Sequence, residues 1–114
     1  MGEDRSDILQ GTLDLMVLKT LDQIGPQHGY GLALRIEQIS RDALRVNQGT
    51  IYLCLVRLVQ KKWITARWGT SANHRRAKFY EISKAGRKQL RAETENWDRI
   101  VGVMERVLRP EGRA

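Results

Sequence analysis

The side chains with the most evident chemistry in this chain of 114 residues are cationic, and they concentrate in one segment. Eleven basic residues and one acid, Glu81, lie between Arg57 and Arg91. This segment therefore carries a net charge of about +10, while the rest of the chain sums to about −3. A folded domain gains no stability from such self-repulsion, so the asymmetry indicates that a polyanion binds opposite it.

The remaining reactive side chains form no catalytic or metal-binding set. The chain has one cysteine, Cys54, and two histidines, His28 and His74, and their spacing fits no metal site. It contains no GxxxxGKS/T, GxSxG or HExxH motif. We therefore predict that the protein is not an enzyme and needs no metal or cofactor. Cys54 lies among apolar residues, which favours a small buried hydrophobe over the alternative, a redox sensor.

Length and composition indicate one cytoplasmic globular domain. A chain of this size can bury a small core of its own. No apolar run approaches the roughly 20 residues that span a bilayer, and the acidic start MGEDRSD lacks the pattern of a signal peptide. A single cysteine cannot form an intrachain disulfide, which fits a reducing cytosol.

The elements that must position these charges can be predicted from the spacing of apolar residues. Such residues recur at three- and four-residue steps, which is typical of amphipathic helices. Gly25-Pro26 ends the first helix, Asn47 caps the third, and Ser83 caps a long last helix that reaches about Leu108. The predicted helices are 8–24, 30–40, 47–61 and 84–108, with a very short strand at Leu44 and Val46.

Two β-type runs follow the third helix. Residues 63–68 and 77–82 alternate in a strand-like way, and the sequence GTSAN at 69–73 is typical of a turn. Together they predict a β-hairpin with a polar tip and basic flanks, in which Trp63 and Trp68 serve in core or wing packing. The order helix, helix, helix, hairpin, long helix is the plan of a mainly α winged helix with a C-terminal dimerisation helix.

The third helix should present one face to the core and another to solvent. Ile51, Leu55 and Leu58 share the first face, with Cys54 at its edge. The opposite face holds Thr50, Leu53, Arg57 and Lys61. A helix with such a face, followed by a basic hairpin, is the arrangement with which winged-helix proteins bind DNA.

The last helix should join two copies of the chain. Five of its apolar residues follow a heptad-like seam, with Thr94 in one slot: Leu90, Trp97, Val101, Met104 and Leu108. About 25 residues at 1.5 Å rise span roughly 37 Å, too long for the seam to pack wholly on so small a core. The predicted homodimer interface contains Leu90, Trp97, Ile100, Val101, Met104, Val107 and Leu108. The predicted division is a winged helix-turn-helix domain at 1–82, a dimerisation helix at 83–109 and a disordered tail at 110–114.

Several sequence blocks resemble one family. The blocks ILQGTLDLMVLKTL, HGYGLALRI, NQGTIYLCLVRL, KKWI and RRAKFYEISKAGRKQL are similar to those of the PadR family of bacterial transcriptional regulators, in its subgroup with one long last helix. The resemblance implies a homodimeric transcriptional repressor that binds double-stranded DNA. It places the third helix of each subunit in a major groove and the wing along the backbone or minor groove. It also implies release by a small aromatic effector.

The third helix departs from the family pattern at three positions. The family usually has GTIYP, a small residue and then LxRLE, whereas this chain has Leu53 for the proline, Cys54 for the small residue and Val59 for the glutamate. Proline suits a first helical turn but is not required there, so the helix is still expected. An outward Leu53 would alter base preference or favour contact with a protein.

The charge pattern and the resemblance together predict the DNA contacts. Gln48 and Arg57 suit base edges, since glutamine pairs with adenine and arginine with guanine, and Leu53 suits a thymine methyl. Arg75 or Arg76 would enter a narrow minor groove or, as the alternative, attract the backbone in general. The predicted DNA-binding residues are Tyr30, Gln48, Thr50, Tyr52, Leu53, Arg57, Lys61, Lys62, Asn73, His74, Arg75, Arg76 and Lys78.

Other interpretations stay open for some of these residues and for the whole chain. Trp97 is either a stacking plate for an aromatic ligand between two subunits or part of the interface core. Tyr30 either binds a phosphate or packs its ring against the protein with the hydroxyl exposed to solvent. The rival functions are a degenerate winged helix that binds a protein through Leu53, Val56 and Val59, and an RNA-binding protein.

Overall fold

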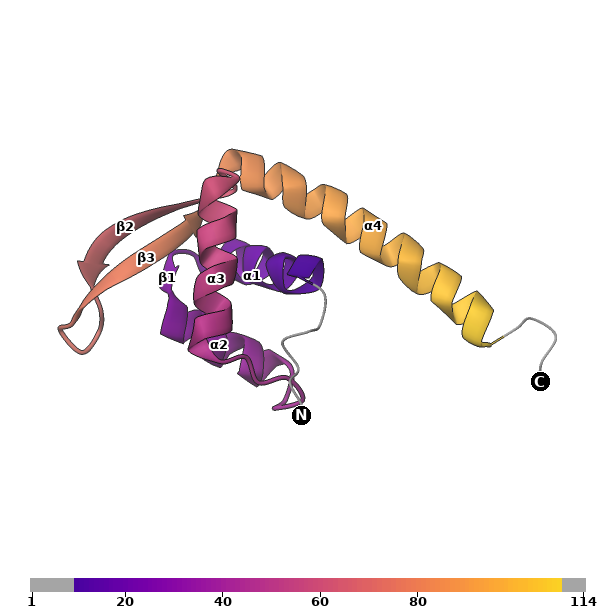
Figure 1. Cartoon of the computed structure of the whole chain (residues 1–114), viewed down its shortest axis with the longest axis horizontal. Helices are drawn as coiled ribbons and strands as arrows, with labels where there is room; N and C mark the ends of the chain where they lie inside the picture. The colour runs from indigo at the N-terminus through magenta and orange to yellow at the C-terminus, as the bar shows by residue number, and fades with distance from the viewer. Residues whose placement is uncertain (1–9, 110–114) are drawn as a thin grey trace.

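The computed structural model describes residues 10–109, which form four helices and a small antiparallel sheet (Figure 1). The elements are α1 (Gln10–Ile24), β1 (Gln27–His28), α2 (Gly29–Ile39), α3 (Gln48–Gln60), β2 (Ile64–Thr70), β3 (Arg76–Ile82) and α4 (Lys84–Leu108). The predicted mainly helical winged helix with a long last helix is confirmed. The first two residues of the predicted helix 8–24, and the tail at 110–114, lie outside the described residues. Within that described part, no helix is long and apolar enough to cross a membrane.

Side-chain caps set where three of the helices begin. His28, Asn47 and Ser83 each accept a hydrogen bond from the backbone N–H three residues further on, at 3.0, 2.8 and 3.0 Å. Each cap satisfies one of the N–H groups that the first turn of a helix leaves free. The first helix ends at Ile24 and is followed by Gly25, whose φ of +84° suits a residue without a Cβ. The predicted caps at Asn47 and Ser83 are therefore confirmed.

The core lies where α1, α2, α3 and the base of the sheet meet. Its fully buried side chains are Val17, Leu18, Leu21, Leu32, Ile51, Cys54, Leu55, Leu58 and Ile64. Leu90 also belongs to this core, because only 6% of its surface is exposed. The prediction that Leu90 lies in a dimer interface is therefore wrong: the first turns of α4 pack on α1, and their apolar residue is used within the protomer.

The sheet has the order β1-β3-β2, with all neighbours antiparallel. The hairpin of β2 and β3, residues 64–82, is called the wing below. The two-residue β1 was not predicted, since so short a strand has no alternation of its own and forms only by pairing with β3. The strand predicted at Leu44 and Val46 is absent from the described structure. These two residues pack on the core in an irregular segment, where Ser40 Oγ accepts the N–H of Leu44 at 3.1 Å.

The start of α4 is fixed to the turn between α3 and β2. Ser83 donates two hydrogen bonds there, from Oγ to the Lys62 carbonyl at 2.8 Å and from its N–H to the Trp63 carbonyl at 3.0 Å. Arg87 adds an ion pair to Asp22 of α1 at 3.3 Å. Beyond these contacts α4 runs away from the body, on the side opposite the wing (Figure 1).

Candidate nucleic-acid interface

A hollow of about 1010 Å³ lies between the wing and the N-terminal ends of α2 and α3. We call it the groove. Its helical wall contains Tyr30, Gln48 and Tyr52, and its wing wall contains Asn73, Arg75, Arg76 and Lys78. The structure thus brings together seven of the residues predicted to bind DNA.

The helical wall presents hydrogen-bonding side chains at the beginning of two helices. Tyr30 and Tyr52 are 55% and 58% exposed, and Gln48 is exposed at the first position of α3. Their hydroxyl and amide groups are the kinds that bind phosphates and base edges. Leu53 follows on the outward face and is 60% exposed, as the sequence predicts, while Thr50 is half-buried.

The wing wall owes its charge to strand register. Trp68 lies opposite Lys78, and Thr70 lies opposite Arg76, so these four residues share one sheet face. Arg76 and Lys78 lie over the Trp68 ring, at 4.9 and 5.6 Å from its centroid.

The tip of the wing is closed by local hydrogen bonds. Ser71 donates its N–H to the Arg75 carbonyl at 2.7 Å, and the N–H of His74 donates to the Ser71 carbonyl at 2.9 Å. His74 adopts a φ of +64°, in the left-handed region that tight turns use. Asn73, His74 and Arg75 are therefore exposed at a defined tip.

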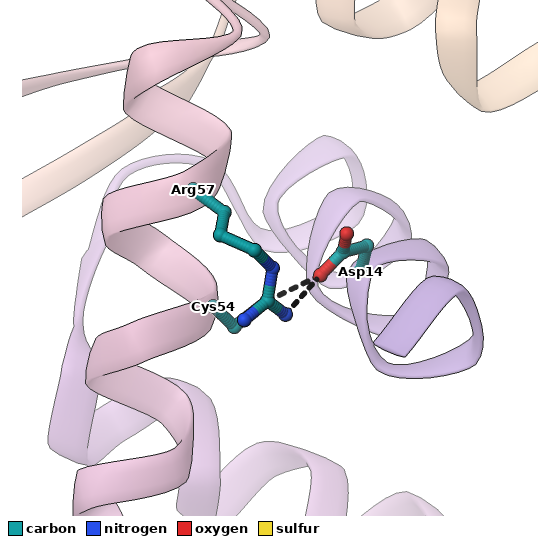
Figure 2. Close-up of polar contacts among 3 residues, drawn as sticks. All are labelled: Asp14, Cys54 and Arg57. Atoms are coloured by element: carbon teal, nitrogen blue, oxygen red, sulfur yellow. Dashed lines mark hydrogen bonds and ion pairs between the residues drawn. The ribbon is translucent and has the colours of Figure 1, made fainter. Parts of the chain in front are cut away.

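Arg57 does not face the groove, which corrects its predicted role at base edges. Its Nη2 donates to Asp14 Oδ1 at 2.8 Å, and the same carboxylate oxygen accepts from Cys54 Sγ at 3.0 Å (Figure 2). Arg57 is only 26% exposed in its side chain, and its Nε is buried without a hydrogen-bond partner in the described structure. The guanidinium thus ties α3 to α1.

Cys54 lies inside the core rather than at the edge of the buried face. Its surface is fully buried, and burial together with the hydrogen bond to Asp14 raises the pKa of the thiol. A thiol held neutral in this way is a poor nucleophile. This supports the interpretation of Cys54 as a small buried side chain and opposes the redox sensor.

Lys61 and Lys62 lie at the other end of α3 from the groove, beside the start of α4. Lys61 Nζ lies 4.9 Å from the centroid of the Trp63 ring. Lys62 has a φ of +64° and gives its carbonyl to Ser83. Both side chains are exposed, but neither lines the groove, so the structure separates them from the other predicted contacts.

The distal part of α4 presents an apolar face to solvent. The exposed large apolar residues there are Trp97, Ile100, Val101, Val103, Met104, Val107 and Leu108. Six of them belong to the predicted dimer interface, and Val103 was not predicted to be part of it. Among residues 10–109, no group of three or more histidine, cysteine or acidic side chains could hold a metal ion.

A helix that opens beside a cationic wing, on a three-helix core, defines the class of winged-helix DNA-binding proteins. Within this class, comparison with known families identifies one family. Residues 17–92 match the Transcriptional regulator PadR-like family, and the chain belongs to this family. It is a DNA-binding transcriptional regulator and not an enzyme.

Solved structures and one relative are similar over nearly the whole chain. A PadR-like transcriptional regulator from Bacillus cereus is 25% identical, with a TM-score of 0.77 over 92% of this chain and 99% of that one. A transcriptional regulator from Clostridium thermocellum shares the fold, with a TM-score of 0.79, 23% identity and 90% and 96% of the two chains covered. An uncharacterized protein of Lysinibacillus sphaericus is 25% identical over 101 residues, which cover 89% of this chain and 92% of that protein.

Proposed function

We propose that the protein is a homodimeric, cytoplasmic repressor that binds an inverted-repeat operator. The observation that supports this proposal is that one protomer has two surfaces suited to a binding partner. The groove is lined by cations and exposed tyrosines, and the distal part of α4 exposes an apolar face. Two protomers joined along α4 would present two grooves related by two-fold symmetry, and such a pair reads a palindromic site.

In this proposal α3 reads bases and the wing binds the backbone. Gln48 lies at the first turn of α3, where a side chain reaches base edges, and Leu53 offers an apolar contact to a thymine methyl. Tyr30 and Tyr52 bind phosphates from the helical wall. With Arg57 bound to Asp14, base reading rests on Gln48 and Leu53 rather than on an arginine.

The proposal includes an effector site at the dimer interface. Trp97 is exposed on the apolar face of α4, where a second subunit would cover it. A planar aromatic compound that stacks between two such rings would change the angle between the subunits and release the operator. The test uses a variant in which Trp97 is the only tryptophan, and planar aromatic compounds are titrated into it. Its tryptophan fluorescence must change, and an unchanged spectrum contradicts this site.

A second candidate function rests on one observation, the exposure of apolar side chains on α3: Leu53 is 60% exposed, and Val59, further along the helix, is 37% exposed. A degenerate winged helix would use this apolar surface to bind a protein and would not recognise a DNA sequence.

Selection from random duplex DNA at near-physiological salt distinguishes the repressor from the protein-binding module. The purified protein is incubated with a random pool, and the retained duplexes are sequenced. We expect an inverted repeat whose half-sites lie about one helical turn apart. Retention without an enriched sequence would contradict the operator and favour the protein-binding function.

A further inference from the structure

The groove carries an exposed tryptophan that the contacts proposed above do not use. Trp68 lies within β2, is 56% exposed, and lines the groove together with Tyr30 and Tyr52. A tryptophan carries a large apolar area, and leaving half of it in water forgoes stabilisation that burial would bring. Its exposure toward the groove therefore indicates a partner that covers the ring.

The pairing of β2 with β3 explains why Trp68 faces this way. Ile64 lies opposite Ile82 at the base of the wing, and both are buried in the core. Alternate residues share a sheet face, so Trp68 lies on the same face as Ile64. Toward the tip the strands leave the core, and the face that packs inside the protein at Ile64 becomes a wall of the groove at Trp68.

Two cations lie over the ring, and both are free to bind an external anion. Arg76 and Lys78 both lie within the range of cation–π attraction to Trp68. Neither forms an ion pair with any residue of the described chain, 10–109, whereas Arg67 on the opposite sheet face pairs with Glu81 at 3.6 Å. An apolar ring with two free cations over it matches a backbone in which the C–H groups of the sugars alternate with anionic phosphates.

We propose that Trp68 is a DNA-contacting residue, whose indole packs against the sugar–phosphate backbone of one strand while Arg76 and Lys78 bind the phosphates beside it. This inference rests on the proposed function, in which the groove holds duplex DNA. The contact of the ring is apolar and does not depend on base identity. It therefore adds affinity for every sequence and releases no counterions of its own.

The test compares wild type with Trp68→Ala, Trp68→Phe and Arg67→Ala on one duplex over a range of salt concentrations. We expect Trp68→Ala to weaken binding roughly tenfold at every salt concentration, which is the effect of one good aromatic contact. The slope of log affinity against log salt should stay that of wild type. Phenylalanine should restore most of the loss. Arg67→Ala is the matched control from the neighbouring position on the other sheet face, and it should change affinity by less than about twofold.

Two results would overturn the inference. Trp68→Ala that binds as tightly as wild type would show that the ring is not in contact with DNA. A salt slope lowered in Trp68→Ala would show that the ring only holds Arg76 and Lys78 in place. The fluorescence of a variant with Trp63→Phe and Trp97→Phe, which keeps Trp68 alone, must also change when duplex is added. Failure of the proposed function is distinct, because wild type itself would then select no operator.

Discussion

The ion pair between Asp14 and Arg57 holds a cation of α3 against α1, and its contribution to the stability of the fold can be measured. Asp14 is 8% exposed, and replacing it with asparagine leaves the half-buried guanidinium of Arg57 without a charge partner. The asparagine oxygen can still accept a hydrogen bond, but the charge is lost, and a hydrogen bond between charged groups is worth about 1.5–3 kcal/mol. We expect Asp14→Asn to lower the free energy of unfolding by that amount in urea titrations.

The matched control for this prediction is the other ion pair that α1 makes. Asp22 pairs with Arg87 of α4 at 3.3 Å, but both side chains are substantially exposed. Such pairs are worth about 0–1 kcal/mol. Asp22→Asn should therefore be nearly neutral, and an equal loss in the two variants would mean that burial around Asp14 has no part in the effect.

The thiol of Cys54 should make the protein less stable in alkali. Burial and the hydrogen bond to Asp14 raise the pKa of this group above its ordinary value of 9.0. The native state therefore keeps a proton that the unfolded state loses, and stability that is complete below pH 9 falls as pH rises. The slope approaches about 1.4 kcal/mol for each pH unit.

Urea midpoints measured from pH 7 upward should show this loss in wild type and less of it in Cys54→Ser. Serine does not titrate in this range and can still donate to Asp14. Tyr80 keeps some alkaline sensitivity in both proteins, because burial raises the pKa of its hydroxyl as well. Curves that stay parallel above pH 9 would refute the assignment of the effect to Cys54.

Among the elements, the junction between α4 and the wing depends on one glycine. A Cβ placed on Gly86 would lie 2.0 Å from the Trp63 carbonyl oxygen, which is backbone and cannot move aside alone. Gly86→Ala should destabilise the fold by about 1–3 kcal/mol or more. Gly11→Ala is the control, since nothing lies within 4 Å of its Cβ, and helix propensity should then raise stability slightly. Thermal melts that rank the two variants in the opposite order would contradict the close approach.

Elements with a local signal could be predicted from the sequence. The caps at Asn47 and Ser83 act within one helical turn, and the apolar periods fix the helices over many residues. The strand β1 could not be predicted, because its two residues pair with Tyr80 and Phe79 more than fifty positions away. The segment at Leu44 has strand-like residues, but no strand among residues 10–109 pairs with it.

The residues of the candidate site could be predicted where charge alone determines that a side chain is exposed. They were harder to predict where packing determines which way a side chain points. The cations of the wing are exposed because lysine and arginine remain in water. Arg57 has the same chemistry, but its side chain reaches a carboxylate on another helix. The sequence does contain a sign of this, since Asp14 interrupts the apolar residues around Leu13 and Val17. The position of Trp68 in the groove follows from the register between β2 and β3, and no short-range sequence pattern gives that register.

In the whole molecule, the projection of α4 leaves the chain extended. The radius of gyration is 16.1 Å and the longest dimension 58 Å, whereas about 13 Å is usual for 100 compact residues. The difference comes from the distal part of α4, which contacts little of its own protomer and exposes an apolar face. A second copy that pairs along this face would bury it and restore a compact assembly.

A charge placed in the middle of that face should therefore separate the protomers. Val101→Glu should give a folded monomer in sedimentation equilibrium, because the buried carboxylate would have no partner in the dimer. Ala92→Glu adds the same charge on the far side of α4 and should stay dimeric. Since each protomer would then hold only one half-site, Val101→Glu should also lose operator affinity by at least about 100-fold while keeping its weak, salt-dependent binding to any duplex. A monomer that binds the full operator as wild type does would contradict the paired reading of two half-sites.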